Sequence, residues 1–110
     1  MAVQEEGNVK RKLSEAEHGL VSFLLGKEIT DTLEADPKPE GMGSLRFVGQ
    51  NGRKFGSCVA ETTFTDADGV LVSAALYLDQ FGELFELDLW KVDFSPVQRI
   101  PPVNELENSK

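Results

Sequence analysis

Residues 61–96 read ETTFTDADGVLVSAALYLDQFGELFELDLWKVDFSP, and the pattern of this stretch decides the fold. Apolar and polar residues alternate through 70–79 and again through 83–93, which is typical of strands with one buried face. Residues 66–69 (DADG) predict a turn with its glycine in the left-handed conformation, and residues 80–82 predict a second turn. Pro96 ends the pattern, because proline has no N–H to donate to a central strand ladder.

Two further runs precede this stretch, at residues 43–50 and 53–65. They are separated by Asn51-Gly52, and this dipeptide between alternating runs is the strongest short signal for a β-hairpin. After residue 89 the apolar positions change faces, which predicts a bulge or bend near Trp90. We therefore predict four antiparallel strands, each beside the next one in the chain, at 43–50, 53–65, 70–79 and 83–93.

The chain also predicts one helix, at residues 15–25. Ser14 and Glu17 stand at the two positions of a capping box, in which each side chain accepts from the other residue's backbone N–H. An apolar stripe at helical spacing follows, and Gly26 is placed to end the helix. The predicted fold is therefore α+β, with an N-terminal helix packed on one face of a four-stranded antiparallel β-meander. We expect a disordered arm at 1–11, a single domain at 12–100 that contains a linker at 36–41, and a polar tail at 101–110.

Alternation assigns each strand residue either to a face covered by the helix or to an outer face. The covered face is apolar and includes Phe85 and Cys58, which we expect to be a buried thiol rather than a nucleophile. Its other predicted members are Leu45, Phe47, Ala60, Phe64, Val70, Val72, Ala74, Leu76, Leu78, Leu87 and Leu89. The outer face is predicted to carry Arg46, Ser57, Val59, Glu61, Thr63, Ser73, Ala75, Tyr77, Glu86, Asp88 and Trp90.

The composition argues against several classes of protein. A net charge of −8 and a pI near 4.6 disfavour nucleic-acid binding, which requires Lys and Arg. No apolar run reaches the roughly 20 residues of a membrane span, and the N-terminus lacks the basic and apolar regions of a secretory signal. A single cysteine among 110 residues excludes an internal disulfide and fits a reducing compartment. We therefore expect a cytoplasmic protein that is monomeric when free.

The acidic residues are concentrated on the predicted sheet. Residues 61–93 contain eight carboxylates and one base, Lys91, which is a local charge of −7. Three of these carboxylates share the outer face with two aromatic residues, and such a combination suits a basic protein partner. The candidate partner-binding residues are Glu61, Tyr77, Glu86, Asp88 and Trp90.

Catalytic and metal sites are less favoured interpretations of the same residues. Paired carboxylates can act as general acid and base, but no Gly-rich phosphate loop or second catalytic residue type accompanies them. Asp66 and Asp68 resemble part of a calcium loop, yet a strand follows where the remaining ligands are needed. His18, the only histidine, has no ligand at metal-binding spacing. We expect no catalytic residue, no metal and no cofactor.

Four segments carry a resemblance to a known family. They are RKLSEAE at 11–17 leading to FLL at 23–25, GMGSLRFV at 41–48, FTDADGV at 64–70 and GELFELDLWKVDFSP at 82–96. On these segments the chain resembles a family of short bacterial proteins classed as a domain of unknown function. The resemblance implies a bacterial origin and supplies no catalytic assignment. The size, negative charge and compactness of the chain are also similar to those of bacterial immunity proteins, which neutralise a cognate toxin.

The leading expectation is a cytosolic protein-binding domain, most concretely an immunity-type inhibitor that covers the active site of a basic toxin such as a nuclease. Enzymes that act on nucleic acid carry positive grooves, which an acidic face can fill by mimicking phosphate. The alternative is a structural or regulatory subunit that oligomerises through its open sheet face or edge. A small hydrolase that uses Glu61, Glu86 and Asp88 is the least favoured of the three.

Overall fold

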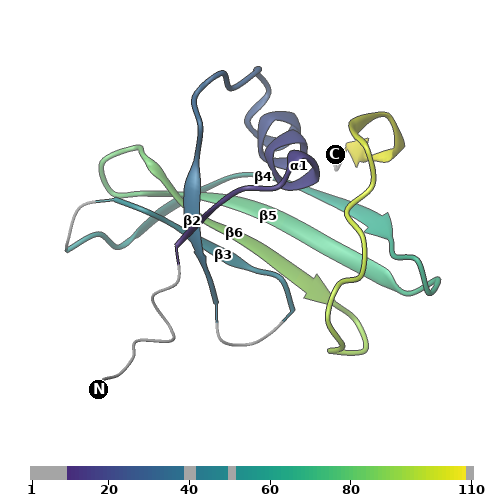
Figure 1. The fold of residues 1–110 in the computed structure, drawn as a ribbon. Helices are drawn as coiled ribbons and strands as arrows, with labels where there is room; N and C mark the ends of the chain where they lie inside the picture. The colour runs from purple at the N-terminus through teal and green to yellow at the C-terminus, as the bar shows by residue number, and fades with distance from the viewer. Residues whose placement is uncertain (1–9, 39–41, 50–51, 109–110) are drawn as a thin grey trace.

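One helix packs on one side of an antiparallel sheet, so the fold is α+β (Figure 1). The computed structural model describes residues 10–38, 42–49 and 52–108. The helix is α1 (Glu15–Leu25). The strands are β1 (Arg11–Lys12), β2 (Glu34–Pro37), β3 (Leu45–Phe47), β4 (Phe55–Thr65), β5 (Leu71–Asp79), β6 (Leu84–Lys91) and β7 (Glu107–Asn108). Within the described residues they form one seven-stranded sheet in the order β1-β2-β3-β6-β5-β4-β7.

The helix has the bounds and the caps that the sequence predicts. The Ser14 hydroxyl accepts from the Glu17 N–H at 3.1 Å, and the Glu17 carboxylate accepts from the Ser14 N–H at 2.8 Å. Gly26 is left-handed, with φ of 83°, and its N–H donates to the Ser22 carbonyl. The same Glu17 carboxylate receives two hydrogen bonds from the Arg11 guanidinium, at 2.7 and 2.8 Å. Strand β1 is therefore attached to the start of the helix.

Strands β4, β5 and β6 form the predicted meander. Its first turn is closed by the Gly69 N–H, which donates to the Asp66 carbonyl, and Gly69 has the predicted positive φ, 84°. The second turn is closed by the Gly82 N–H, which donates to the Asp79 carbonyl, and Gly82 has φ of 83°. Local turn chemistry therefore determines the order of these three strands.

The predicted hairpin between the first two strands is wrong. Strand β3 does not pair with β4. It pairs with β6 at the other side of the meander, through Leu45↔Leu87 and Arg46↔Glu86. Gln50 and Asn51, on which that prediction partly rested, lie outside the described residues. The side chain of Arg53, which lies just before β4, links the end of β3 to the start of β6, because its guanidinium donates to the carbonyls of Phe47 and Leu84. An alternating strand suits either edge of a meander, so alternation alone does not choose between them.

The segment predicted as a linker contains a strand. Strand β2 lies between β1 and β3, with Ala35 opposite Arg11 on one side and Phe47 on the other. Pro37 is tolerated at its last position because β1 has already ended there. Of the predicted arm at 1–11, residues 1–9 lie outside the described residues, while Arg11 belongs to β1. The predicted tail contains the short 3-10 helix η2 (Val103–Glu105) and β7, which pairs with β4.

The hydrophobic core lies between α1 and one face of the sheet, as the alternation predicts. Its buried members are Leu20, Val21, Leu24, Ala35, Leu45, Phe47, Phe64, Val72, Ala74, Leu76, Leu87 and Leu89. Four expected members lie outside this cluster, and two of them, Val70 and Leu78, are only partly buried. Cys58 is exposed, because the register shift in β4 between Cys58 and Ala60 places it opposite Tyr77, on the outer face. Phe85 is buried outside this cluster, under the guanidinium groups of Arg46 and Arg53.

Strand β6 continues regularly to its last residue, so the bulge predicted near Trp90 is wrong. Trp90 pairs with Ser73 and Lys91 with Val72, and the irregularity in this pair of strands lies instead near Tyr77. The regular register turns Lys91 toward the covered side, where its side chain is 0% exposed. Polarity at residue 91 is therefore not evidence that it faces solvent.

The buried Lys91 ammonium joins three parts of the chain. It donates to Asp66 Oδ2 at 2.8 Å, to Asp68 Oδ2 at 2.7 Å and to the Pro96 carbonyl at 3.3 Å. Asp66 also accepts from the backbone N–H groups of Ala67, Gln98 and Arg99. We call Lys91, Asp66 and Asp68 the lysine clamp. It attaches the β4–β5 turn and residues 96–99 to the end of β6.

Hydrogen bonding and charge determine the ionisation of the clamp. Burial by itself raises the pKa of Asp66, but the hydrogen bonds from Lys91, Gln98, Ala67 and Arg99 outweigh it and lower that pKa to about 2. Burial likewise lowers the pKa of Lys91, but Asp66 and Asp68 hold it above its ordinary value. Both partners therefore stay charged at neutral pH.

The face assignment predicts different costs for two truncations. Leu87 is 0% exposed in the core, so Leu87→Ala should cost about 2–5 kcal/mol of unfolding free energy. Thr63 lies opposite Ser73 on the outer face, so Thr63→Ala should cost less than about 1 kcal/mol. Urea unfolding measures both, and equal losses would contradict the assignment.

The clamp predicts how stability depends on acid. The folded pKa of Asp66 is about 2, below its ordinary 3.8, so its contribution is complete above about pH 4 and is lost as the pH falls toward 2. We expect the wild-type protein to lose more stability over this interval than Asp66→Asn, which has no group titrating at that position. Urea unfolding of both proteins at several pH values gives the comparison. If the unfolding free energies of the two proteins fell by the same amount as the pH is lowered, the fold would not hold Asp66 ionised.

Candidate functional site

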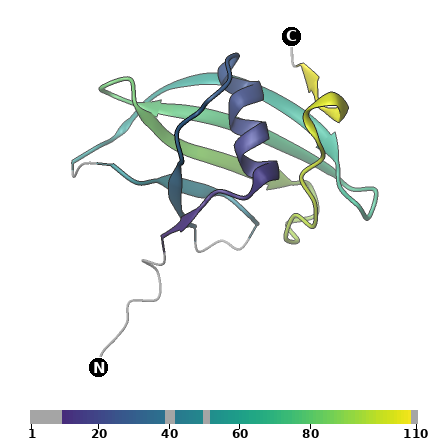
Figure 2. The ribbon, with the colours of Figure 1, turned by 45° about the horizontal axis from the view of Figure 1, so that its top comes forward.

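The outer face of the sheet is the candidate site. Figures 1 and 2 show α1 and the C-terminal segment together on one side of the sheet, and no other helix of the described residues lies on the opposite side. An antiparallel sheet accepts such an arrangement when its second face carries polar and aromatic side chains.

The sheet register brings the five candidate residues together on this face. Tyr77 on β5 lies opposite Glu86 on β6, and Trp90 lies opposite Ser73. Ala75 on β5 lies between Glu61 on β4 and Asp88 on β6. Directly opposed residues have Cβ atoms about 5 Å apart, so the carboxylates and the two aromatic rings form one continuous surface.

Glu86 is not available as a free charge, although the sequence predicted it to be one of the carboxylates that bind a basic partner. It is 9% exposed, it accepts from Lys38 Nζ at 3.1 Å, and it forms an ion pair with Arg46. Lys38 also lies 3.8 Å from Asp88. The outer face therefore combines carboxylates with two cations, Lys38 and Arg46. Lys38 was not predicted at this face because it lies in the segment predicted as a linker.

Three more of the eight carboxylates in residues 61–93 form ion pairs within the fold. Asp66 and Asp68 bind Lys91, and Asp79 faces Arg53 at 3.3 Å. These three carboxylates stand at the ends of strands rather than on the outer face. The charge that the outer face presents is consequently smaller than the sequence count indicates.

An exposed aromatic pair stands at one end of this face. The rings of Trp90 and Phe94 meet edge to face with centroids 5.9 Å apart, and the two residues are 50% and 67% exposed. Phe94 has φ of 65°, the positive value found at no other non-glycine residue of the described chain. Bulky residues rarely adopt this conformation, which costs roughly 1–2 kcal/mol.

Two hydrogen-bonded groups hold the Phe94 turn. The Phe94 N–H donates to the Lys91 carbonyl at 2.8 Å, and the Asp93 carboxylate accepts from the N–H and hydroxyl of Ser95. Phe94 was not among the predicted site residues. The sequence signal for its position is the DFSP segment, because an Asp-x-Ser pair followed by proline favours a turn.

A second aromatic pair lies toward the other end of β5. Tyr77 meets Phe55 edge to face with centroids 5.3 Å apart, and Phe55 is 59% exposed. Burial, followed by the nearby charges of Asp88, Cys58, Glu61 and Glu86, raises the pKa of the Tyr77 hydroxyl. Tyr77 is therefore neutral at physiological pH and can donate a hydrogen bond.

The outer face does not provide the groups of a nucleophilic site. Cys58 Sγ lies 4.0 Å from Glu61 Oε2, and burial together with that carboxylate raises the pKa of the thiol. A reactive cysteine requires the opposite shift. The ring of His18 is on α1, beside the Asp31 carbonyl, so it does not serve as a base for Cys58. Among the described residues no three His, Cys, Asp or Glu side chains are grouped to hold a metal ion.

Comparison with known proteins gives a family and no activity. The sequence model of a family described as "Domain of unknown function (DUF6984)" matches residues 10–101. Neither the curated proteins nor the solved structures yielded a match to this chain. None of the helices in the described residues is long and apolar enough to cross a membrane.

Proposed function

The chain belongs to the DUF6984 family, whose description assigns no activity, and we propose that this member is a protein-binding domain that uses its outer sheet face. The single observation that carries the proposal is the Trp90–Phe94 pair. Two large rings are left half-exposed or more, side by side, and one of them is held in a disfavoured backbone conformation. The contact between the rings leaves much of their apolar surface in water, and aromatic residues supply much of the binding energy at protein interfaces.

The composition of the face supports a protein as its partner. The aromatic pairs stand at its two ends, with Glu61, Glu86 and Asp88 between them. Lys38 and Arg46 lie along the side formed by β3 and residue 38. Aromatic contacts surrounded by charges of both signs are typical of the rim and core of an interface.

A basic partner fits the charge of the chain, and the finer proposal is an immunity-type inhibitor that covers the active site of a basic toxin such as a nuclease. Glu61 and Asp88 are the accessible carboxylates of the face, and Asp93 adds another beside Phe94. A net charge of −8 attracts a cationic protein at long range and speeds its association.

Self-association through the same face is the second candidate. The exposed rings and the two signs of charge favour it, since a two-fold contact requires a surface that is complementary to itself. Pairing through the sheet edges is less favoured, because the edge strands β1 and β7 contain two residues each and offer a short ladder.

Substitutions on the outer face distinguish binding of a basic partner from self-association. Trp90→Ala should weaken binding of the partner by about 2 kcal/mol or more, mainly through faster dissociation. Glu61→Lys combined with Asp88→Lys should slow association and reduce its dependence on salt. Affinity capture with wild-type and Trp90→Ala protein identifies the partner that depends on the face, and surface plasmon resonance measures the rates.

The matched control reverses two carboxylates on the helix side, Glu15→Lys with Glu105→Lys, and should leave both rates nearly unchanged. Light scattering at micromolar concentration tests self-association, for which we expect a monomer. A dimer that Trp90→Ala dissociates would favour the second candidate. A partner bound equally well by wild-type and Trp90→Ala protein would exclude the outer face as its site.

A further inference from the structure

A second surface, separate from the outer face, has the form of a ligand site. A cavity of about 900 Å³ opens where the end of α1, residues 27–33 and the β5–β6 turn meet. We call residues 27–33, which connect α1 to β2, the strap. Cavities that hold small molecules typically enclose about 300–1,000 Å³, so this one is large enough for a compact organic ligand.

The floor of the cavity is apolar. It is formed by Leu25 from α1, Ile29 from the strap, Phe47 from β3, and Leu78 and Leu84 from β5 and β6. Leu25, Ile29 and Leu84 border the core but are only partly buried. Covering their remaining surface releases water and favours binding of an apolar group.

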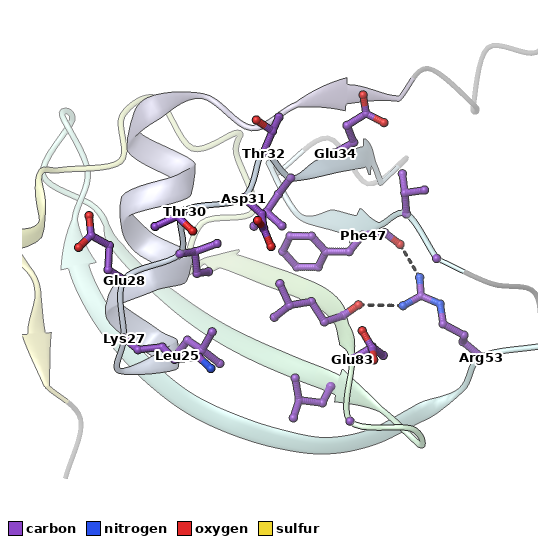
Figure 3. A pocket seen from close by; sticks show the side chains of 17 residues that line it. Leu25, Lys27, Glu28, Thr30, Asp31, Thr32, Glu34, Phe47, Arg53 and Glu83 are labelled. Carbon is purple, nitrogen blue, oxygen red and sulfur yellow. Dashed lines mark hydrogen bonds between the residues drawn. The ribbon is translucent and has the colours of Figure 1, made fainter.

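The rim of the cavity is acidic. Glu28 and Asp31 from the strap, Glu34 from β2 and Glu83 from the β5–β6 turn all line it (Figure 3). None of these four carboxylates forms an ion pair with another described residue, and Lys27 is the one lysine of the lining. The rim therefore attracts positive charge.

Arg53 does not neutralise this rim. Its guanidinium is 8% exposed and donates to the carbonyls of Phe47 and Leu84, as the dashed lines of Figure 3 show. It also faces Asp79, so its charge is already compensated. The arginine thus builds the wall of the cavity and leaves the four rim carboxylates available.

The strap is lightly attached and can adjust to an occupant. Among the described residues its backbone accepts two hydrogen bonds from other parts of the chain: the Leu13 N–H donates to the Leu33 carbonyl, and the His18 ring donates to the Asp31 carbonyl. A second hollow, of about 580 Å³, lies on its other side against α1. A segment held by so few backbone hydrogen bonds to its surroundings has low local stability.

We propose that this cavity binds a small organic cation with an apolar body, namely an aryl- or alkylamine. The apolar body rests on Leu25, Ile29 and Leu84, and the ammonium lies at the rim, where the four carboxylates are spread around the opening and together favour positive charge. Both halves are needed, because a neutral apolar ligand gains nothing from the rim and a hydrophilic cation gains nothing from the floor.

The experiment compares three probes that share one ring system: naphthylethylamine, naphthylethanol and naphthylacetate. Titration of ¹⁵N-labelled protein, followed by amide chemical shifts, gives both affinity and location. We expect the amine to bind about two- to fivefold more tightly than the alcohol, the ratio expected of an exposed charge pair, and the carboxylate most weakly. Shifts should centre on the strap, and added salt should remove the advantage of the amine.

Two pairs of variants make the test specific. Glu28→Gln with Asp31→Asn removes two rim charges at nearly constant shape and should weaken the amine while leaving the alcohol unchanged. Glu15→Gln with Glu105→Gln removes two charges away from the cavity and should change neither. Equal binding of amine and alcohol, shifts centred outside the strap, or no binding of any probe at millimolar concentration would each overturn the proposal. These outcomes leave the outer-face proposal unaffected, since its residues are not involved.

Discussion

The rest of the structure depends on burying one lysine. An ammonium group leaves water only where oxygens replace its hydration, and Lys91 finds three, from Asp66, Asp68 and Pro96. This requirement brings the β4–β5 turn and residues 96–99 to the end of β6. It also orients the proposed binding surface. When Lys91 points inward its neighbour Trp90 points outward, and the Lys91 carbonyl receives the N–H that holds Phe94 beside it.

Many of the charged residues of this protein therefore serve first to hold its strands and helix together. Arg11 joins β1 to the helix through Glu17, Arg53 connects β3, β5 and β6, and Glu86 gathers Lys38 and Arg46 on the outer face. A count of acidic residues along the chain overstates the negative charge that is exposed to a binding partner. What remains accessible is divided between two places: a mixed aromatic and charged face, and an acidic rim around the cavity beneath the strap. These suit different partners, one a protein surface and the other a small cation.

Local signals in the sequence are sufficient for the helix and for β4, β5 and β6, because a capping box and glycine turns act between near neighbours. They do not place β3, since its alternation suits both edges of the meander. Cys58 is misassigned because the register shift in β4 between Cys58 and Ala60 reverses the alternation at that residue. Of the candidate site, the register positions of Glu61, Tyr77, Asp88 and Trp90 follow from alternation, whereas the pairing of Glu86 with Lys38 depends on the unforeseen β2. The cavity arises from how the strap packs, for which the sequence has no periodic signal.

A double-mutant cycle on the lysine clamp tests the central claim most directly. The unfolding free energies of wild type, Lys91→Met, Asp66→Asn and the double variant are measured in urea at neutral pH. The account predicts that each single substitution is strongly destabilising and that the double variant loses clearly less than their sum, because each partner is harmful mainly when left alone. The exposed pair Arg99 and Glu105, 3.6 Å apart, serves as control through Arg99→Met and Glu105→Gln, with little coupling expected. Additive losses at Lys91 and Asp66 would contradict the account.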